Sequence, residues 1–262
     1  MSAADAADRP VRLADGYRDT VSPVHLLPPQ CKIAALVGCV LVVVATPRDW
    51  FYAFAGYAAV LVAVAVVARV PVGYVLRRAT VELPFVAFAL ALPLLAEGPR
   101  VRFAGLELSR AGLEGAWGIL VKGTLGVAGS VLLGATTRPP DLLHGLRRLR
   151  FPPMLVQIAM FMLRYVEVVS GELRRMRVAQ QSRGFDRGAP HRLLTVARTA
   201  GTLFVRSFER GERVYLAMRS RGYTGVLPAP VGQPATGRQW VTAAAPLASV
   251  VVVLVGNWAV RR

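Results

Sequence analysis

Five segments of the chain are runs of apolar residues with little or no charge. They are Ile33–Thr46, Trp50–Ala68, Leu83–Ala96, Ala111–Thr137 and Val241–Val260. The second run has no charged residue over 19 positions, close to the ~20 residues that a membrane-spanning helix needs. The first run is shorter, so a span there needs either the preceding Cys31 and Lys32 or a thin bilayer, and the third run extends backwards over 79–82. The pattern predicts an all-α polytopic membrane protein with about five transmembrane helices.

Between the fourth and fifth runs, apolar residues recur every three or four positions, which is the spacing of one face of a helix. One stripe comprises Leu155, Ile158, Met162, Tyr165, Val169, Leu173 and Met176, and a second comprises Phe204, Phe208, Gly211, Tyr215 and Met218. The spacing predicts two long amphipathic helices. We expect the apolar sides to pack these helices into one rigid piece, through Leu155, Tyr165, Met176, Phe204, Phe208 and Tyr215.

Positive charge is concentrated in the same segment. The 262 residues contain 32 Lys+Arg and 15 Asp+Glu, a formal net charge of +17. Seventeen arginines and six acids lie between Arg138 and Arg221, which leaves +11 there. Because positive loops favour the cytoplasmic side of a membrane, this segment is expected inside.

The charge pattern divides the chain into four parts. We expect a cytoplasmic N-terminal segment (1–30), four transmembrane helices (31–137), a cytoplasmic domain of amphipathic helices (138–225), and a linker with a final transmembrane helix (226–262). Five spans would leave Arg261 and Arg262 outside, against the charge rule. Either that tail is tolerated or Phe151–Val169 enters the membrane.

The two amphipathic helices end in the same short sequence, 38 residues apart. Ser182-Arg183-Gly184-Phe185 matches Ser220-Arg221-Gly222-Tyr223. Glycine readily adopts the left-handed conformation that closes a helix, and a cation is favourable at a helix C-terminus. Capping alone would explain one such end. Two copies favour two docking sites on a two-fold or pseudo-two-fold partner.

The residues around these ends resemble the two signature segments of energy-coupling factor transporter T components, particularly the cobalt-transport (CbiQ-type) branch. The similar segments are 172–185 and 209–225, with further similarity in Thr136-Thr137, in 139–143 and in 163–165. The family usually has Ala-Arg-Gly where both copies here have Ser-Arg-Gly, a small-for-small change that leaves docking plausible.

The resemblance implies a scaffold in the cell membrane of a prokaryote. Its partners would be two ATP-binding cassette ATPase subunits and a separate substrate-binding membrane component. The implied ATPase-coupling residues are Ser182, Arg183, Gly184, Ser220, Arg221 and Gly222. Cobalt is the substrate that the resemblance favours, with nickel, biotin or another vitamin as alternatives.

The chain lacks the motifs of an enzyme or of a metal or nucleotide site. A P-loop needs a lysine after glycine, whereas the two lysines, Lys32 and Lys122, lie in Gln-Cys-Lys-Ile and Leu-Val-Lys-Gly. The histidines are scattered and the two cysteines form no metal knuckle. We therefore expect no catalytic residues, no bound metal and no cofactor, with ATP hydrolysis left to partner subunits.

Ionisable residues inside predicted spans are costly and suggest function. Lys122 lies in the middle of the fourth run, eight residues after Glu114 on roughly the same face. An ion pair of Lys122 with Glu114 or Glu82 is the structural interpretation, and a transport route is the rarer one. Gly126, Ser130 and Gly134 form a row of small residues that permits close helix packing or docking of the substrate-binding component.

The arginine-rich segment also admits a different class of function. Basic amphipathic helices can bind nucleic acid or anionic lipid. Against nucleic acid, the arginines alternate with apolar stripes and acids and are flanked by membrane spans. We therefore expect the lipid bilayer, and no nucleic acid, among the partners.

Overall fold

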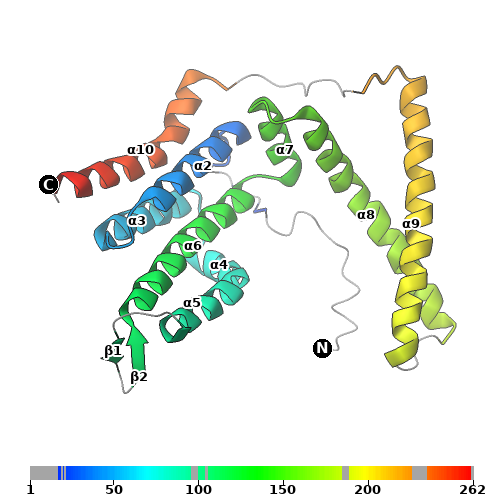
Figure 1. Ribbon diagram of the computed structural model, residues 1–262. Coiled ribbons are helices and arrows are strands. Elements are labelled where there is room, and N and C mark those ends of the chain that lie inside the picture. The colour runs from blue at the N-terminus through cyan, green and yellow to red at the C-terminus, as the bar shows by residue number, and fades with distance from the viewer. Residues whose placement is uncertain are drawn as a thin grey trace. The chain divides into compact units, whose positions relative to one another are not determined.

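The computed structural model describes residues 17–18, 20, 22–95, 100–103, 106–184, 189–225 and 235–260 (Figure 1). The chain divides into two units. The membrane unit, as we call it, comprises the described residues within 16–149 and 232–262. The two-helix unit comprises the described residues within 150–231.

The membrane unit contains most of the secondary structure. Its helices are α2 (Pro29–Ala45), α3 (Phe51–Val67), α4 (Val72–Arg78), the 3-10 helix η1 (Ala79–Glu82), α5 (Leu83–Leu95), α6 (Arg110–Thr136), α7 (Pro139–Arg148) and α10 (Gly237–Val260). The two-helix unit consists of α8 (Pro153–Ser182) and α9 (Ala189–Ser220).

The predicted all-α polytopic fold is confirmed. Among the described residues, four stretches are long and apolar enough to cross a membrane: Gly73–Leu95, Arg110–Thr136, Pro153–Ser182 and Gly237–Ala259. The helices α2 and α3 are apolar but shorter, at 17 residues each. Each of the five apolar runs therefore becomes helical. By length and composition alone, α8 also meets the criterion.

One element was not predicted. The strands β1 (Arg100–Phe103) and β2 (Leu106–Ser109) pair antiparallel between α5 and α6, from Arg100 opposite Ser109 to Phe103 opposite Leu106. The Ser109 hydroxyl then caps α6 by accepting a hydrogen bond from the Gly112 amide, as Ser does at helix N-termini. The hairpin is thus an extension of the turn between two predicted spans.

Two buried clusters hold the membrane unit together. One cluster joins α2, α3 and α10 through Val43, Ala53, Phe54, Tyr57 and Val250. The other joins the end of α3 to the end of α6 through Ala65, Ala68, Val70, Leu132 and Ala135. The last helix, α10, therefore returns to pack against the first two spans (Figure 1).

Glycines allow the helix backbones of the membrane unit to approach closely. A Cβ atom on Gly38 or Gly56 would lie 2.9 or 2.8 Å from side-chain carbons of Leu247 and Val253 on α10. Lipid provides no hydrophobic drive for helices to associate, so membrane helices depend on such close packing.

Lys32 ties the start of α2 to the end of α6. Its ammonium donates hydrogen bonds to the Thr136 carbonyl (2.9 Å) and the Thr137 hydroxyl (3.2 Å). Next to it, α7 packs on α2, where Gly145 faces the backbone of Pro29 and Gln30. Residues 138–149, which the sequence grouped with the cytoplasmic domain, thus pack against membrane helices.

We expect Gly112→Ala to separate α5 from α6. A Cβ at position 112 would lie 2.7 Å from the Leu92 carbonyl oxygen and 2.7 Å from the Pro93 Cα. Because these are backbone atoms, relief requires a helix shift, and overpacking of this kind costs about 1–3 kcal/mol. Thermal unfolding in detergent should show the loss. The control is Gly115→Ala, whose Cβ makes only a 3.9 Å contact with Leu92 and should leave the melting temperature unchanged or higher.

Candidate functional site

The second of the two predicted tips, 220–223, closes α9 with a full Schellman motif. The Tyr223 amide donates to the Met218 carbonyl (3.0 Å) and the Gly222 amide donates to the Arg219 carbonyl (3.0 Å). Gly222 has φ +85°, in the left-handed region that L-residues with a Cβ disfavour. The predicted glycine cap is therefore present at this end, with Arg221 between the last residue of α9, Ser220, and the capping Gly222.

The first tip has the same geometry as far as it is described. The Gly184 amide donates to the Gln181 carbonyl (2.9 Å), and Gly184 has φ +71°. Arg183 stands where Arg221 stands in the other copy, while Phe185 lies outside the described residues. In the described part of the chain, Arg183 and Arg221 are exposed and have no ion-pair partner. Both guanidinium groups are thus available to bind another molecule.

The helices that carry the tips run antiparallel and cross (Figure 1). Gln180 of α8 bonds to Thr199 of α9, and Gln157 near the start of α8 donates to the Tyr223 hydroxyl after the end of α9. The tips therefore lie at opposite ends of the pair, about 40 Å apart along α8 at 1.5 Å per residue.

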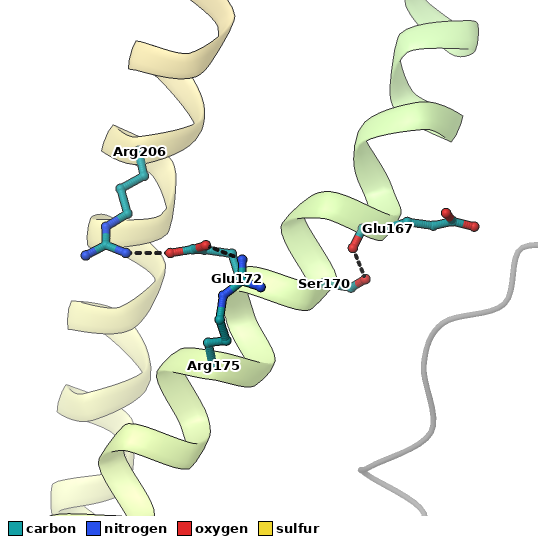
Figure 2. A network of polar contacts seen from close by, with 5 residues as sticks. All are labelled: Glu167, Ser170, Glu172, Arg175 and Arg206. Carbon is teal, nitrogen blue, oxygen red and sulfur yellow. Dashed lines mark hydrogen bonds and ion pairs between the residues drawn. The ribbon is translucent and has the colours of Figure 1, made fainter.

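An ion-pair network joins the helices between those ends (Figure 2). Glu172 of α8 accepts hydrogen bonds from Arg175 one turn away (2.7 Å) and from Arg206 of α9 (2.5 Å). Arg175 first, and Arg206 second, hold the pKa of the Glu172 carboxyl below its usual value. The bridge is therefore intact at neutral pH and weakens only as the pH falls through that lowered pKa. Glu167, five residues before Glu172 on α8, points away from α9 (Figure 2).

The apolar stripes only partly face each other. Tyr165 and Tyr215 line a groove of about 440 Å³ between α8 and α9, and Met176 is half-buried. In contrast, Leu155, Phe204 and Phe208 are 53%, 71% and 60% exposed.

The side of α9 that faces α8 only partly coincides with the predicted stripe. Gly211, Tyr215 and Met218 of that stripe line the groove. Phe204 and Phe208 do not line it, and Leu203 and Ser207, each one residue or 100° away on the helix, take their place. The 3.6-residue period identifies an apolar face but does not say which molecule covers it.

The intramembrane ionisable residues do not form the pair that their positions suggested. Glu114 binds Arg110 on its own helix (3.3 Å), with both side chains exposed. Lys122 donates to the Val44 carbonyl at the end of α2 (2.8 Å). Glu82 accepts from the Thr124 hydroxyl (3.1 Å), and its second carboxylate oxygen is buried without a partner. The expected ion pair of Lys122 with either glutamate is wrong, because each of the three groups has a different neighbour.

The row of small residues on α6 does not pack against another described helix. A Cβ on Gly126 or Gly134 would meet nothing within 4 Å, and Ser130 is exposed with its hydroxyl bonded to the Gly126 carbonyl. The close helix contact lies instead at Gly129, next to Ser130, where the side chain of Leu36 on α2 packs against the glycine. Within the described ranges there is also no group of three or more His, Cys, Asp or Glu residues that could hold a metal.

Comparison with known proteins decides the family. The family model of the cobalt transport protein CbiQ matches residues 20–230. The chain belongs to the cobalt transport protein family. Residues 20–230 include both Ser-Arg-Gly tips and all the described helices except α10, so the resemblance inferred from the tips extends to most of the fold.

Individual relatives agree with this assignment. The energy-coupling factor transporter transmembrane protein EcfT of Thermanaerovibrio acidaminovorans is 33% identical over 225 residues, covering 80% of this chain and 82% of the relative. The cobalt transport protein CbiQ of Rhodobacter capsulatus is 29% identical, covering 68% and 73%. EcfT of Bacillus subtilis is 27% identical, covering 80% and 83%. This chain is therefore a multi-pass membrane component, the T component, of the energy-coupling factor type of transporter.

Sequence patterns did not reveal the contacts between α8 and α9. Gln157 and Tyr223 are 66 positions apart, and Glu172 and Arg206 are 34 apart. One feature of the sequence could have indicated the contact at the second tip: its aromatic residue is Tyr223, whereas the first tip has Phe185. Only tyrosine has a hydroxyl, and the Tyr223 hydroxyl also donates to the Gly225 carbonyl (2.9 Å). The second tip is therefore tied to the start of α8 by a bond that a phenylalanine cannot make.

We expect Gly184→Ala and Gly222→Ala each to destabilise the tip that it closes. A left-handed conformation costs an L-residue about 1–2 kcal/mol, so the cap and the arginine before it should become mobile. Amide hydrogen exchange at 180–184 or 218–223 should rise in the corresponding variant only. The control is Gly211→Ala inside α9, where a Cβ meets nothing within 4 Å and exchange should stay the same or fall.

Proposed function

We propose that this chain is the coupling scaffold of an energy-coupling factor importer in the prokaryotic cell membrane. Two ATP-binding cassette ATPase subunits would each receive one tip, and a separate substrate-binding membrane component would be held by the same chain. The observation that carries the proposal is the pair of equally capped helix ends, each with an exposed arginine, in a chain of the T-component family.

Arginine suits this docking role. Its planar guanidinium presents five donors to carboxylates or carbonyl oxygens in a partner groove. Each arginine stands between the last residue of its helix and the capping glycine, so its exposed guanidinium lies at the end of a long helix. The residues before the arginines, Ser182 and Ser220, are small, and their hydroxyls donate hydrogen bonds to carbonyls of their own helices. They therefore add little bulk beside each arginine.

The polar contacts between α8 and α9 support transmission of movement. The Gln180–Thr199 bond, the Glu172–Arg206 ion pair and the Gln157–Tyr223 bond occur at three levels of the crossing. A pair held at three levels moves as a rigid body better than one held at a single point. Closure of the ATPases on ATP would bring the two tips together or rotate them, and the crossed pair would pass that shift on.

The uncovered apolar face of α9 supports a further protein partner. Phe204, Phe208, Tyr215 and Leu216 are more than half exposed, and apolar surface of this extent in a cytoplasmic domain is typical of a protein–protein interface. In our proposal the substrate-binding component covers this face.

Cobalt is the substrate that we propose, because the family and the relative from Rhodobacter capsulatus are named for cobalt transport. Nickel or a vitamin remains the alternative, since other relatives are named only as energy-coupling factor components. The substrate would be recognised by the separate membrane component, and ATP hydrolysed by the ATPases.

The tips provide the direct test. Arg183→Glu or Arg221→Glu should each uncouple ATP hydrolysis from uptake in the assembled transporter, because the reversed charge repels an acidic groove. The double variant should lose the ATPases on purification in detergent. The matched control is Arg213→Glu, whose partner Glu209 is a loose 4.0 Å neighbour. It should retain assembly and most of the uptake. Normal uptake and assembly with both tips reversed would disprove the coupling assignment.

A second test concerns substrate selection. Isothermal titration calorimetry of the purified full chain with Co²⁺ and Ni²⁺ should show no stoichiometric site of micromolar affinity or better, since transition metals need a cluster of nitrogen, sulfur or carboxylate ligands. The assembled transporter with its substrate-binding component provides the positive control. A tight site on this chain alone would make it the substrate-binding subunit.

A further inference from the structure

The connection between α6 and α7 consists of two extended residues. Thr137 has φ −144° and ψ 129°, and Arg138 has φ −70° and ψ 145°. Arg138 precedes Pro139, and the residue before a proline is biased towards an extended conformation, so α6 ends here. Hinges in proteins are often made of a few such residues at the ends of elements. We call residues 135–138 the α6–α7 joint.

A segment near the N-terminus holds both sides of this joint. It comprises the described residues within 17–28, and we call it the strap. The Arg18 amide donates a hydrogen bond to the Ala135 carbonyl near the end of α6 (3.0 Å). The guanidinium carbon of Arg138, the N-cap of α7, lies 4.9 Å from the centroid of the Tyr17 ring. Two adjacent residues of the strap therefore contact the end of one helix and the N-cap of the next.

Lys32 fastens the strap to the same joint. Besides its bonds to the Thr136 carbonyl and the Thr137 hydroxyl, its ammonium donates to the His25 carbonyl of the strap (3.3 Å). Lys32 and both threonines are buried. The last carbonyl groups of a helix have no partner within that helix. The Arg18 amide and the Lys32 ammonium therefore supply bonds that the end of α6 needs.

Contacts within the strap fix the position of the Tyr17 ring. The His25 ring forms hydrogen bonds with the Ser22 hydroxyl through Nδ1 (2.7 Å) and with the Thr20 hydroxyl through Nε2 (3.2 Å). Tyr17 meets the same histidine ring edge to face, with the centroids 6.1 Å apart. Val24 packs against the buried cluster that joins the ends of α3 and α6. The strap is thus an ordered part of the membrane unit.

The strap also reaches α4. The guanidinium carbon of Arg18 lies 5.1 Å from the centroid of the Tyr74 ring, and that of Arg78 lies 5.4 Å from it. A cation over an aromatic face is attracted by the charge distribution of the ring. Tyr74 packs against the same buried cluster as the strap. Through Tyr17 and Arg18, the strap therefore joins α4, the end of α6 and the start of α7.

The joint lies on a covalent path between the two units. Only residues 149–152 separate the end of α7 from the start of α8. In the coupling role proposed above, a shift of α8 is passed along the chain to α7 and then to the joint. A joint that bends freely would absorb this shift, whereas a braced joint would pass it on to α6 and α4.

We propose that the strap braces the α6–α7 joint, and that this brace is required for movement to pass from α8 into the membrane unit. Tyr17 and Arg18 are then positioning residues, which act through Arg138, Tyr74 and the end of α6. This inference rests on the proposed coupling function. A strap that only completed the fold would affect stability, but not the amount of substrate moved per ATP.

Hydrogen exchange on the purified full chain in nanodiscs measures the brace directly. Tyr17→Leu removes the aromatic ring, and Tyr17→Phe is the matched control that keeps it. We expect amides at 137–144 to exchange about two- to fivefold faster in Tyr17→Leu, the factor that corresponds to one cation–π contact at an exposed site. Exchange there should be unchanged in Tyr17→Phe, and exchange in α10 should be unchanged in both variants.

The assembled transporter in proteoliposomes tests the role in coupling. The measurement is the uptake of radioactive Co²⁺ per ATP hydrolysed, at equal amounts of assembled complex. Tyr17→Leu and Arg138→Gln should each lower this ratio several-fold, whereas Tyr17→Phe and Arg138→Lys, which keep the ring and the cation, should retain it. Because both losses remove the same contact, the double variant Tyr17→Leu/Arg138→Gln should be no worse than the more severe single variant. Arg138→Gln alone provides the test if Tyr17→Leu does not assemble.

Three results would overturn the proposal. Unchanged exchange at 137–144 in Tyr17→Leu would show that the strap does not hold the joint. Faster exchange with a normal ratio of uptake to hydrolysis would make the strap a purely structural element. Additive effects of the two single variants would show that Tyr17 and Arg138 act separately.

The tip variant Arg183→Glu separates this inference from the proposed function. If Arg183→Glu uncouples the transporter and the strap variants do not, only the role of the strap fails. If neither change affects coupling, the proposed coupling function fails, and the role of the strap fails with it.

Discussion

Close approach of helix backbones at glycine is the constraint on which the membrane unit depends. A leucine side chain has a similar free energy whether it contacts lipid or another helix. One arrangement of the helices is therefore selected by close packing and by hydrogen bonding of the polar groups. Gly38 and Gly56 let α10 reach α2 and α3, and Gly112 lets α6 reach the backbone of α5. The remaining features follow from these contacts. They include a cavity among α2, α3, α6 and α10 and the level at which Lys122 meets Val44.

The two-helix unit is held by different forces. Polar links at three levels join α8 to α9, whereas much of the apolar surface of these helices remains uncovered. Among the described residues, neither α8 nor α9 contributes to a buried apolar cluster. The crossing is therefore defined mainly by these polar links, which suits the coupling role that we propose.

The two tips share a cap but differ in their attachment. The Tyr223 hydroxyl connects the second tip to Gln157, at the beginning of the same helix pair. The corresponding residue of the first tip is Phe185, which has no hydroxyl to donate or accept. A duplicated sequence has therefore produced two ends that are equal in their arginine and glycine and unequal in how they are anchored.

The sequence by itself determined the all-helical membrane fold, the position of each apolar helix and the glycine-capped ends at Gly184 and Gly222. These features depend on local physics: the length of an apolar run, the period of a helix, and the conformational freedom of glycine. Only the tertiary structure decided which groups meet. It placed Lys122 against Val44 and not against Glu82 or Glu114. It also turned Leu203 and Val214, and not Phe204 and Phe208, towards α8. Periodicity identifies the apolar face of a helix, and a charged residue in a span indicates that a polar partner is required. The rotation and depth of each helix, however, arise from packing against other helices, and no single segment of sequence contains that information.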